Sequence, residues 1–200
     1  MAEHIMTREA GAISLRAYEH ALRLGHPYLG GEHYLLALAA ASQPAGAVLR
    51  AHGVAPERVE AEIVRLSGAG LFGDLDRDAL TTVGIDADAV RAATEASFSR
   101  ATLARAARDI HRGPGRLSPR RRSGATRDGV FLPHGPGVNH ALVGARREAA
   151  ARHAAQADIE HLALGVLAVS EGLVPSILSR LGTSGPALST AILDRYPPAN

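Results

Sequence analysis

Two of the Glu-His pairs in this sequence begin apolar runs and could bind a ligand. Glu32-His33 and Glu160-His161 each begin an apolar run, and the pairs are 128 positions apart. Such a pair could coordinate a metal, serve only as a helix start, or bind a ligand through its carboxylate. Metal coordination is disfavoured because adjacent helical residues point about 100° apart and the sequence has no H-E-x-x-H spacing and no third ligand at a recognisable distance. The other two interpretations stay open, with His33 and His161 expected to pack or cap.

The composition excludes several kinds of catalysis. All 22 basic residues are Arg, and the chain has no Cys. A Walker-type lysine, a Schiff-base lysine, a Ser-Lys dyad and a catalytic thiolate are therefore all absent. Residues 68–73 have the spelling G-x-G-x-x-G, but no strand precedes them, so they are interpreted as a flexible joint. We expect no catalytic residues, no metal, no cofactor and no enzymatic activity.

The sequence around the two pairs also repeats. An alanine-rich segment precedes each pair, at 10–24 and 138–155, and a short segment ending in Gly follows each, at 47–53 and 176–182. An internal repeat of this length determines the expected architecture. It predicts an all-α fold of two four-helix units related by a pseudo-twofold axis.

Helical spacing and punctuation locate the helices. In repeat one, Thr7 is a candidate N-cap, Gly25 and Pro27 stop the first helix, and Pro56 suits the first turn of the fourth. Repeat one is then four helices between Thr7 and Ser67. The corresponding helices of repeat two are expected near 138–154, 160–170, 174–181 and 186–196.

The segment between the repeats differs from both. Residues 79–90 echo 48–59 and predict a half-repeat, with an extra helix from Asp86 towards Ile110. From His111 to about Gly129 the chain is too poor in apolar residues to offset its ordering entropy, which predicts a disordered basic loop. The expected organisation is repeat one at 1–67, the half-repeat and linker at 68–133, and repeat two at 134–196, with the two repeats packing as one domain.

The basic charge is concentrated in this linker. Six arginines lie between Arg112 and Arg127 with no acid among them, and without these six the net charge changes from +2 to −4. The run could bind nucleic acid through phosphates in a salt-sensitive, sequence-independent way. It lacks interleaved aromatics and a reading helix, so a solvated linker is favoured, and nucleic-acid binding is the alternative function.

Features of export and membrane insertion are missing from the sequence. No run approaches the roughly 18–20 apolar residues of a membrane span. The first residues lack the basic start and apolar core of a signal peptide, and there is no Cys to form disulfides. A cytoplasmic protein without membrane contact is expected.

The residues around the first pair resemble a known repeat. The pattern T-x-x-A…L-G-H-x-Y-x-G-x-E-H-x-L-L-A-L, followed by a short helix ending in Gly-Val, is similar to the Clp repeat. That repeat forms the amino-terminal domain of ClpC- and ClpA-type unfoldases, where two copies pack as a pseudo-twofold helical bundle. The resemblance is specific over 7–66 and traceable over 135–196. Because no motor module is present, it implies a stand-alone relative, similar to small actinobacterial Clp-repeat proteins.

The resemblance also implies a function. It implies a non-catalytic recognition module that binds protein substrates, adaptors or Clp-directed peptides and acts as adaptor, sink or competitor for a ClpC-type unfoldase. In ClpC-type members the Glu of each motif helps to hold phosphoarginine, a role that falls here on Glu32 and Glu160. Because repeat two lacks the Gly-His-x-Tyr turn of repeat one, Glu32 is expected to contribute more than Glu160. A carboxylate at a helix start can accept paired N–H bonds from a guanidinium, while the helix dipole favours the phosphoryl group.

Two departures from the family pattern concern the expected ligands. The family usually has Thr before the Glu, whereas Gly31 and Ile159 stand there, so both candidate sites lack a hydroxyl donor. The aromatic residue usual before the first helix is replaced by Met6 and by His134. Cyclic peptide antibiotics that bind some ClpC domains use that aromatic neighbourhood, and the replacements weaken the expectation that they bind here.

Overall fold

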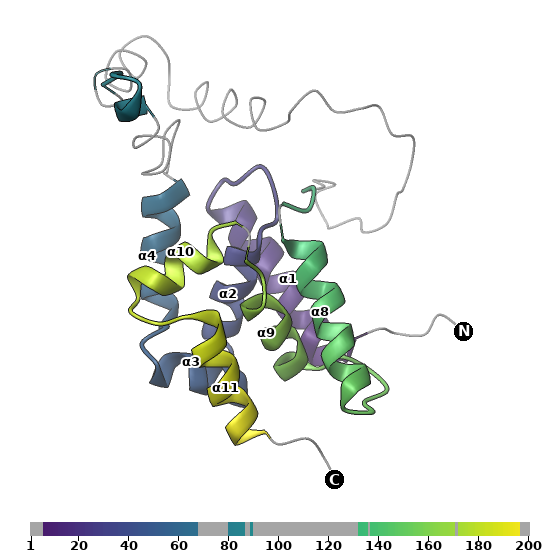
Figure 1. The fold of residues 1–200 in the computed structure, drawn as a ribbon. Helices are drawn as coiled ribbons and strands as arrows, with labels where there is room; N and C mark the ends of the chain where they lie inside the picture. Colours follow the sequence, from purple (N-terminus) through teal and green to yellow (C-terminus); the bar gives the residue numbers. More distant parts are fainter. Residues whose placement is uncertain are drawn as a thin grey trace.

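The fold is described from a computed structural model over residues 6–67, 80–86, 89, 132–135, 137–170 and 172–196. Over these ranges the regular structure is helical, and the prediction of an all-α fold is confirmed (Figure 1). None of the helices in these ranges is long and apolar enough to cross a membrane. Asp86 accepts a hydrogen bond from the Ala89 amide at 3.1 Å, as an N-cap does. The rest of the helix expected from Asp86, and the basic loop, lie outside the described residues.

Repeat one has the helix order that its sequence predicts. Its helices are α1 (Arg8–Arg23), α2 (Gly31–Ala39), α3 (Pro44–Ala51) and α4 (Pro56–Ser67). The Thr7 hydroxyl caps α1 by accepting the Ala10 amide at 3.2 Å. Gly25 and Gly53 follow α1 and α3 with φ of +73° and +79°, a conformation that favours glycine and ends helices.

Repeat two has the same order with one strained joint. Its helices are α8 (Val138–Ala151), α9 (Ile159–Leu167), α10 (Val174–Arg180) and α11 (Gly185–Arg195). The expectation that its first helix reaches residue 154 is wrong, because α8 ends at Ala151 and His153 turns the chain with φ of 56°. The second helix likewise ends at Leu167 and not at residue 170. His153 occupies the position that Gly25 holds in repeat one, and a side chain in this left-handed region costs about 1 kcal/mol.

The core is organised around α2 and α9. Every residue of α2 and every residue of α9 except Glu160 is buried, and a helix that is buried all round belongs in the interior. The two helices pack on each other, α1 covers α2, and α8 covers α9. The remaining helices also pack across the repeats, α3 on α11 and α4 on α10 (Figure 1).

A short segment before the first helix of each repeat pairs with the connection between the first two helices of the other repeat. We call these segments the leaders, residues 6–7 and 134–135, and the connections the joints, residues 24–30 and 152–158. The Thr7 amide donates to Ala157 O at 2.9 Å, and the Gly135 amide donates to Leu29 O at 2.7 Å. These bonds belong to two isolated parallel bridges that are equivalent under the repeat. The exchange ties the two repeats together at the backbone.

Helices α8 and α9 approach unusually closely because of two glycines. A Cβ placed on Gly144 would stand 3.2 Å from the Gly165 Cα. A Cβ placed on Gly165 would overlap the Ala141 carbonyl oxygen and the Ala145 amide nitrogen, which are backbone atoms of α8. Glycine at 165 is therefore required by space rather than by its backbone angles.

Candidate functional site

The two Glu-His pairs open the central helices, and each lies against a helix of the other repeat. Gly31 is packed on the start of α10, where a Cβ at Gly31 would stand 3.1 Å from Val174 Cγ2. Glu160 accepts a hydrogen bond from the backbone of Ala45 in the first turn of α3. Ile159, beside it, is 3% exposed. The four expected site residues therefore lie at two equivalent contacts between the repeats.

Glu32 is folded inward. It is only 3% exposed, and its carboxyl group lies over Gly30, in the space that a Cβ at that position would fill. One of its oxygens, Oε1, is buried without a hydrogen-bond partner. Burial raises the pKa of Glu32 to about 7, against the lowering effect of hydrogen bonds from its own backbone and from the Tyr28 hydroxyl. Near neutral pH a large fraction of Glu32 is therefore uncharged.

The buried histidines form a chain of hydrogen bonds with a single direction. The Gly30 amide donates to His33 Nδ1 at 2.9 Å, so His33 carries its proton on Nε2 and donates to His26 Nδ1 at 2.7 Å. His26 Nε2 then donates to Ser67 Oγ at 3.0 Å, and that hydroxyl donates to Ile63 O at 2.6 Å. Burial and the neighbouring His26 lower the pKa of His33 to about 3, so the ring stays neutral.

The buried histidines and Glu32 are side chains of the kind that bind metals. Ligand atoms of His26, Glu32 and His33 lie within 4.8 Å of one another, and all three residues are buried. Both nitrogens of His33 are already engaged, one as acceptor from a backbone amide and one as donor to His26. A metal would have to break this chain, so the donor set fits a structural link between α2, the joint and α4 better than a metal centre.

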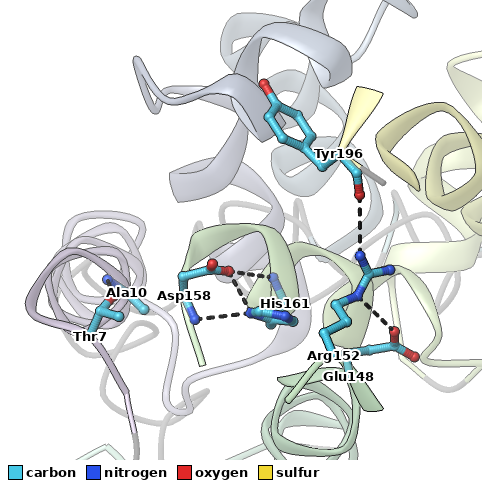
Figure 2. A network of polar contacts seen from close by, with 7 residues as sticks. All are labelled: Thr7, Ala10, Glu148, Arg152, Asp158, His161 and Tyr196. Carbon is cyan, nitrogen blue, oxygen red and sulfur yellow. Dashed lines mark hydrogen bonds and ion pairs between the residues drawn. The ribbon is translucent and has the colours of Figure 1, made fainter. Parts of the chain in front are cut away.

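Repeat two fills the equivalent space differently. Asp158 stands where repeat one has Gly30, and its carboxylate accepts the His161 amide at 3.0 Å and lies 2.6 Å from His161 Nδ1 (Figure 2). Glu160 is consequently only partly buried. Burial raises the pKa of Glu160, and the nearby Asp158 charge adds to this, while its backbone hydrogen bonds act in the opposite direction. Of the two candidate carboxylates, Glu160 is the one within reach of solvent.

A groove lies between the start of α1 and the outer face of α8. Its volume is about 1000 Å³, and its wall is mostly apolar. It is lined by Met6, Thr7, Arg8, Gly11, Asn139, Leu142, Val143, Arg146 and Gln156. Two of these side chains are cationic and none is acidic. Val143 is 54% exposed, so an apolar side chain here is left without cover from the part of the chain that the structure describes.

Sequence reasoning missed three parts of this arrangement. It did not single out Gly30 or Asp158, although comparing the repeats at an offset of 128 places these two residues at the same position. It did not foresee that His26 would join His33 of α2, because His26 lies seven residues earlier in a joint without regular periodicity. The groove was signalled only by Leu142 and Val143, adjacent apolar residues of which one must face outward.

Comparisons with known proteins agree with the fold. Residues 136–197 match the family of Clp repeat N-terminal domains, so the match falls on repeat two, although the sequence pattern was clearer in repeat one. No curated protein matches the sequence. The N-terminal domain of the caseinolytic protease associated chaperone ClpD from Arabidopsis thaliana is similar in structure, with a TM-score of 0.58, 16% identity, and coverage of 98% of this chain and 96% of that one.

A second solved structure, the Hsp104 N-terminal domain from Candida albicans, has a TM-score of 0.54 and 12% identity, covering 98% of this chain and 93% of that one. At these identities the likeness concerns the fold. The family match therefore assigns residues 136–197 to the Clp repeat N-terminal domains, and the two solved structures share the fold over both repeats.

Proposed function

We propose that this chain is a non-catalytic recognition module of the Clp protease system. It would bind protein substrates or adaptors of a ClpC-type unfoldase and act as adaptor, sink or competitor for that partner. The Clp N-terminal fold is typically a protein-interaction module of Clp chaperones, which supports a protein partner in general terms. The observation that carries the proposal is the groove between α1 and α8.

The charges of the groove select one kind of occupant. Arg8 stands in the first turn of α1, where the helix dipole disfavours a cation and favours an anion. Arg146 of α8 lines the same groove, together with the apolar side chains of Met6, Leu142 and Val143. An extended segment of an unfolded or partly folded protein, with apolar side chains flanked by carboxylates, complements this wall in both polarity and charge.

A charge reversal in the groove should weaken such binding. We expect Arg146→Glu to lower the affinity for a fluorescently labelled, reduced and carboxymethylated α-lactalbumin at least tenfold, which corresponds to about 1.4 kcal/mol. Fluorescence anisotropy measures the change. Arg147→Glu is the matched control, because it makes the same charge change on the same helix at an exposed position outside the groove. Equal losses in the two variants would reject the groove as the binding surface.

The second part of the proposal is that the Glu-His pairs at the starts of α2 and α9 bind proteins marked with phosphoarginine. Glu160 is partly exposed at the start of α9, where a carboxylate can pair with a guanidinium and the helix dipole favours a phosphoryl group. Gly31 and Ile159 border the two sites without offering a hydroxyl, so backbone amides would have to hold the phosphoryl group. Glu32 completes the equivalent site of repeat one only if its side chain turns outward.

Phosphoarginine binding should therefore depend more on Glu160 than on Glu32 at neutral pH. Losing a charge-assisted pair costs about 1.5–3 kcal/mol, so Glu160→Ala should weaken binding ten- to a hundredfold in a calorimetric titration with phosphoarginine. Glu32→Ala should have the smaller effect. The same affinity in the wild type and the double variant would remove both residues from the site, and no binding by the wild type would restrict recognition to the groove.

A further inference from the structure

The two repeats differ at one position that controls where the Glu side chain can lie. Gly30 has φ of −109° and ψ of 169°, an extended conformation that any residue adopts, so its backbone does not require glycine. What requires glycine is the space above it, which the Glu32 carboxyl group occupies. In repeat two Asp158 has a similar conformation, with φ of −97° and ψ of −170°, and its side chain fills the equivalent space. There Glu160 lies partly in solvent.

The space over Gly30 suits a neutral carboxylic acid and not a carboxylate. The groups that face Glu32 are the Tyr28 hydroxyl from the joint and the ring of His33 on its own helix. His33 Nδ1, 3.5 Å from Glu32 Oε1, accepts the Gly30 amide and has no proton to donate. Behind His33 lies His26, whose Nδ1 accepts from His33 Nε2, and α10 contributes the apolar Val174 to this end of α2.

No cation is therefore among the groups that these contacts place around Glu32, and Oε1 stays without a partner. An ionised carboxylate here would be buried and unpaired, which is strongly unfavourable. If the Glu32 side chain turned outward, its carboxylate would lie at the first turn of α2, where the helix dipole stabilises a negative charge. Loss of the proton thus favours the outward rotamer for two reasons. This rotamer takes the negative charge out of the apolar space, and it places the charge at the start of the helix.

We propose that Gly30 and Glu32 form a proton-linked switch, in which Glu32 is stored over Gly30 as a neutral acid and turns outward when it loses its proton. The role of this switch rests on the proposed function, because the outward carboxylate would complete the ligand site of repeat one. The switch itself needs no ligand and is a property of the free protein. In repeat two, with Asp158 in place of Gly30, Glu160 lies partly exposed.

The switch can be tested without any ligand by following the side-chain carboxyl carbons of ¹³C-labelled glutamate by NMR between pH 3 and 9. The Glu32→Gln variant identifies the Glu32 signal. In the wild type Glu32 should titrate above the ordinary value of 4.5, with about 7 as the upper limit for a side chain that stays inward when ionised. In Gly30→Ala the added Cβ excludes the carboxyl group, and the pKa should fall towards the ordinary value of 4.5. Gly30→Asp, which copies repeat two, should lower the pKa of Glu32 less than Gly30→Ala does, because in repeat two the Asp158 charge helps to raise the pKa of Glu160.

Gly11→Ala is the matched control, since nothing lies within 4 Å of a Cβ at that position and the pKa of Glu32 should not change. Tyr28→Phe provides a test that leaves Gly30 intact, because removing the hydroxyl should raise the pKa of a stored Glu32 further. An ordinary carboxyl titration of Glu32 in the wild type, or an unchanged titration in Gly30→Ala, would overturn the switch. Failure of phosphoarginine to bind would count against the proposed site and leave the titration result standing.

Discussion

Replacing Glu32 by Gln is expected to stabilise the protein at pH 8 and to leave its stability nearly unchanged at pH 4. The pKa of Glu32 in the folded chain is about 7, above the ordinary value of 4.5, so the folded state holds the proton more tightly than the unfolded state. Stability from this group is complete below pH 4.5 and is lost as the pH rises through 7. The difference corresponds to about 3 kcal/mol above pH 7.

The Glu32→Gln substitution would remove this dependence, because the glutamine amide fills the same space and stays neutral at every pH. Urea unfolding of the wild type and of Glu32→Gln at pH 4, 6 and 8 measures the effect as a gap that widens with pH. Outward rotation of an ionised Glu32 would relieve part of the cost, so about 3 kcal/mol is the upper limit. Glu160→Gln serves as the control, with a smaller gap of the same sign because Glu160 is partly exposed. Parallel stability curves for Glu32→Gln and the wild type would contradict the buried neutral acid.

Gly165→Ala is expected to destabilise the protein by about 3 kcal/mol, although it adds only one methyl group. In an ordinary helix this change is favourable by roughly 0.5–1 kcal/mol, because glycine is a poor helix former. Here the methyl group would overlap backbone atoms at Ala141 and Ala145 of α8, which cannot rotate away as a side chain can. The two helices would have to separate, and the cost should lie at the upper end of the range for overpacking.

Thermal and urea unfolding of Gly165→Ala measure this cost. Gly11→Ala is again the suitable control, since it makes the same substitution in a helix with open space around the new Cβ and should be neutral or slightly stabilising. In repeat one the position equivalent to Gly165 is Ala37, which indicates that α1 and α2 tolerate a methyl group there. If Gly165→Ala were as stable as the wild type, α8 and α9 could not be packed as closely as described.

Local signals in the sequence predicted most of the helices. Thr7 caps α1 and Pro56 begins α4 as expected, since caps and first-turn prolines act within a few residues. The end of α8 was mispredicted because its alanines favour helix up to residue 154. The turn at His153 depends on the pairing of the following joint with Met6 and Thr7, which are far away in the sequence.

The candidate site was less predictable than the fold. An acidic residue in the first turn of a helix is normally a solvent-exposed complement to the dipole, so sequence reasoning gave Glu32 a free carboxylate. Its burial depends on two things that no local pattern contains, the missing Cβ of Gly30 and the cover that folding places over it. The location of Glu160 was predicted correctly as a helix start, but its contact with Ala45 arises from the other repeat.

The exchange of leaders and joints between repeats has an evolutionary consequence. Two identical copies of a single repeat could make the bonds of Thr7 and Gly135 with each other, as an isologous homodimer does. This chain has the connectivity of such a homodimer fused into one gene. In a homodimer every substitution appears on both sides of the axis. After fusion the halves can diverge, and Gly30 in one half and Asp158 in the other are a difference that a symmetric ancestor could not have carried.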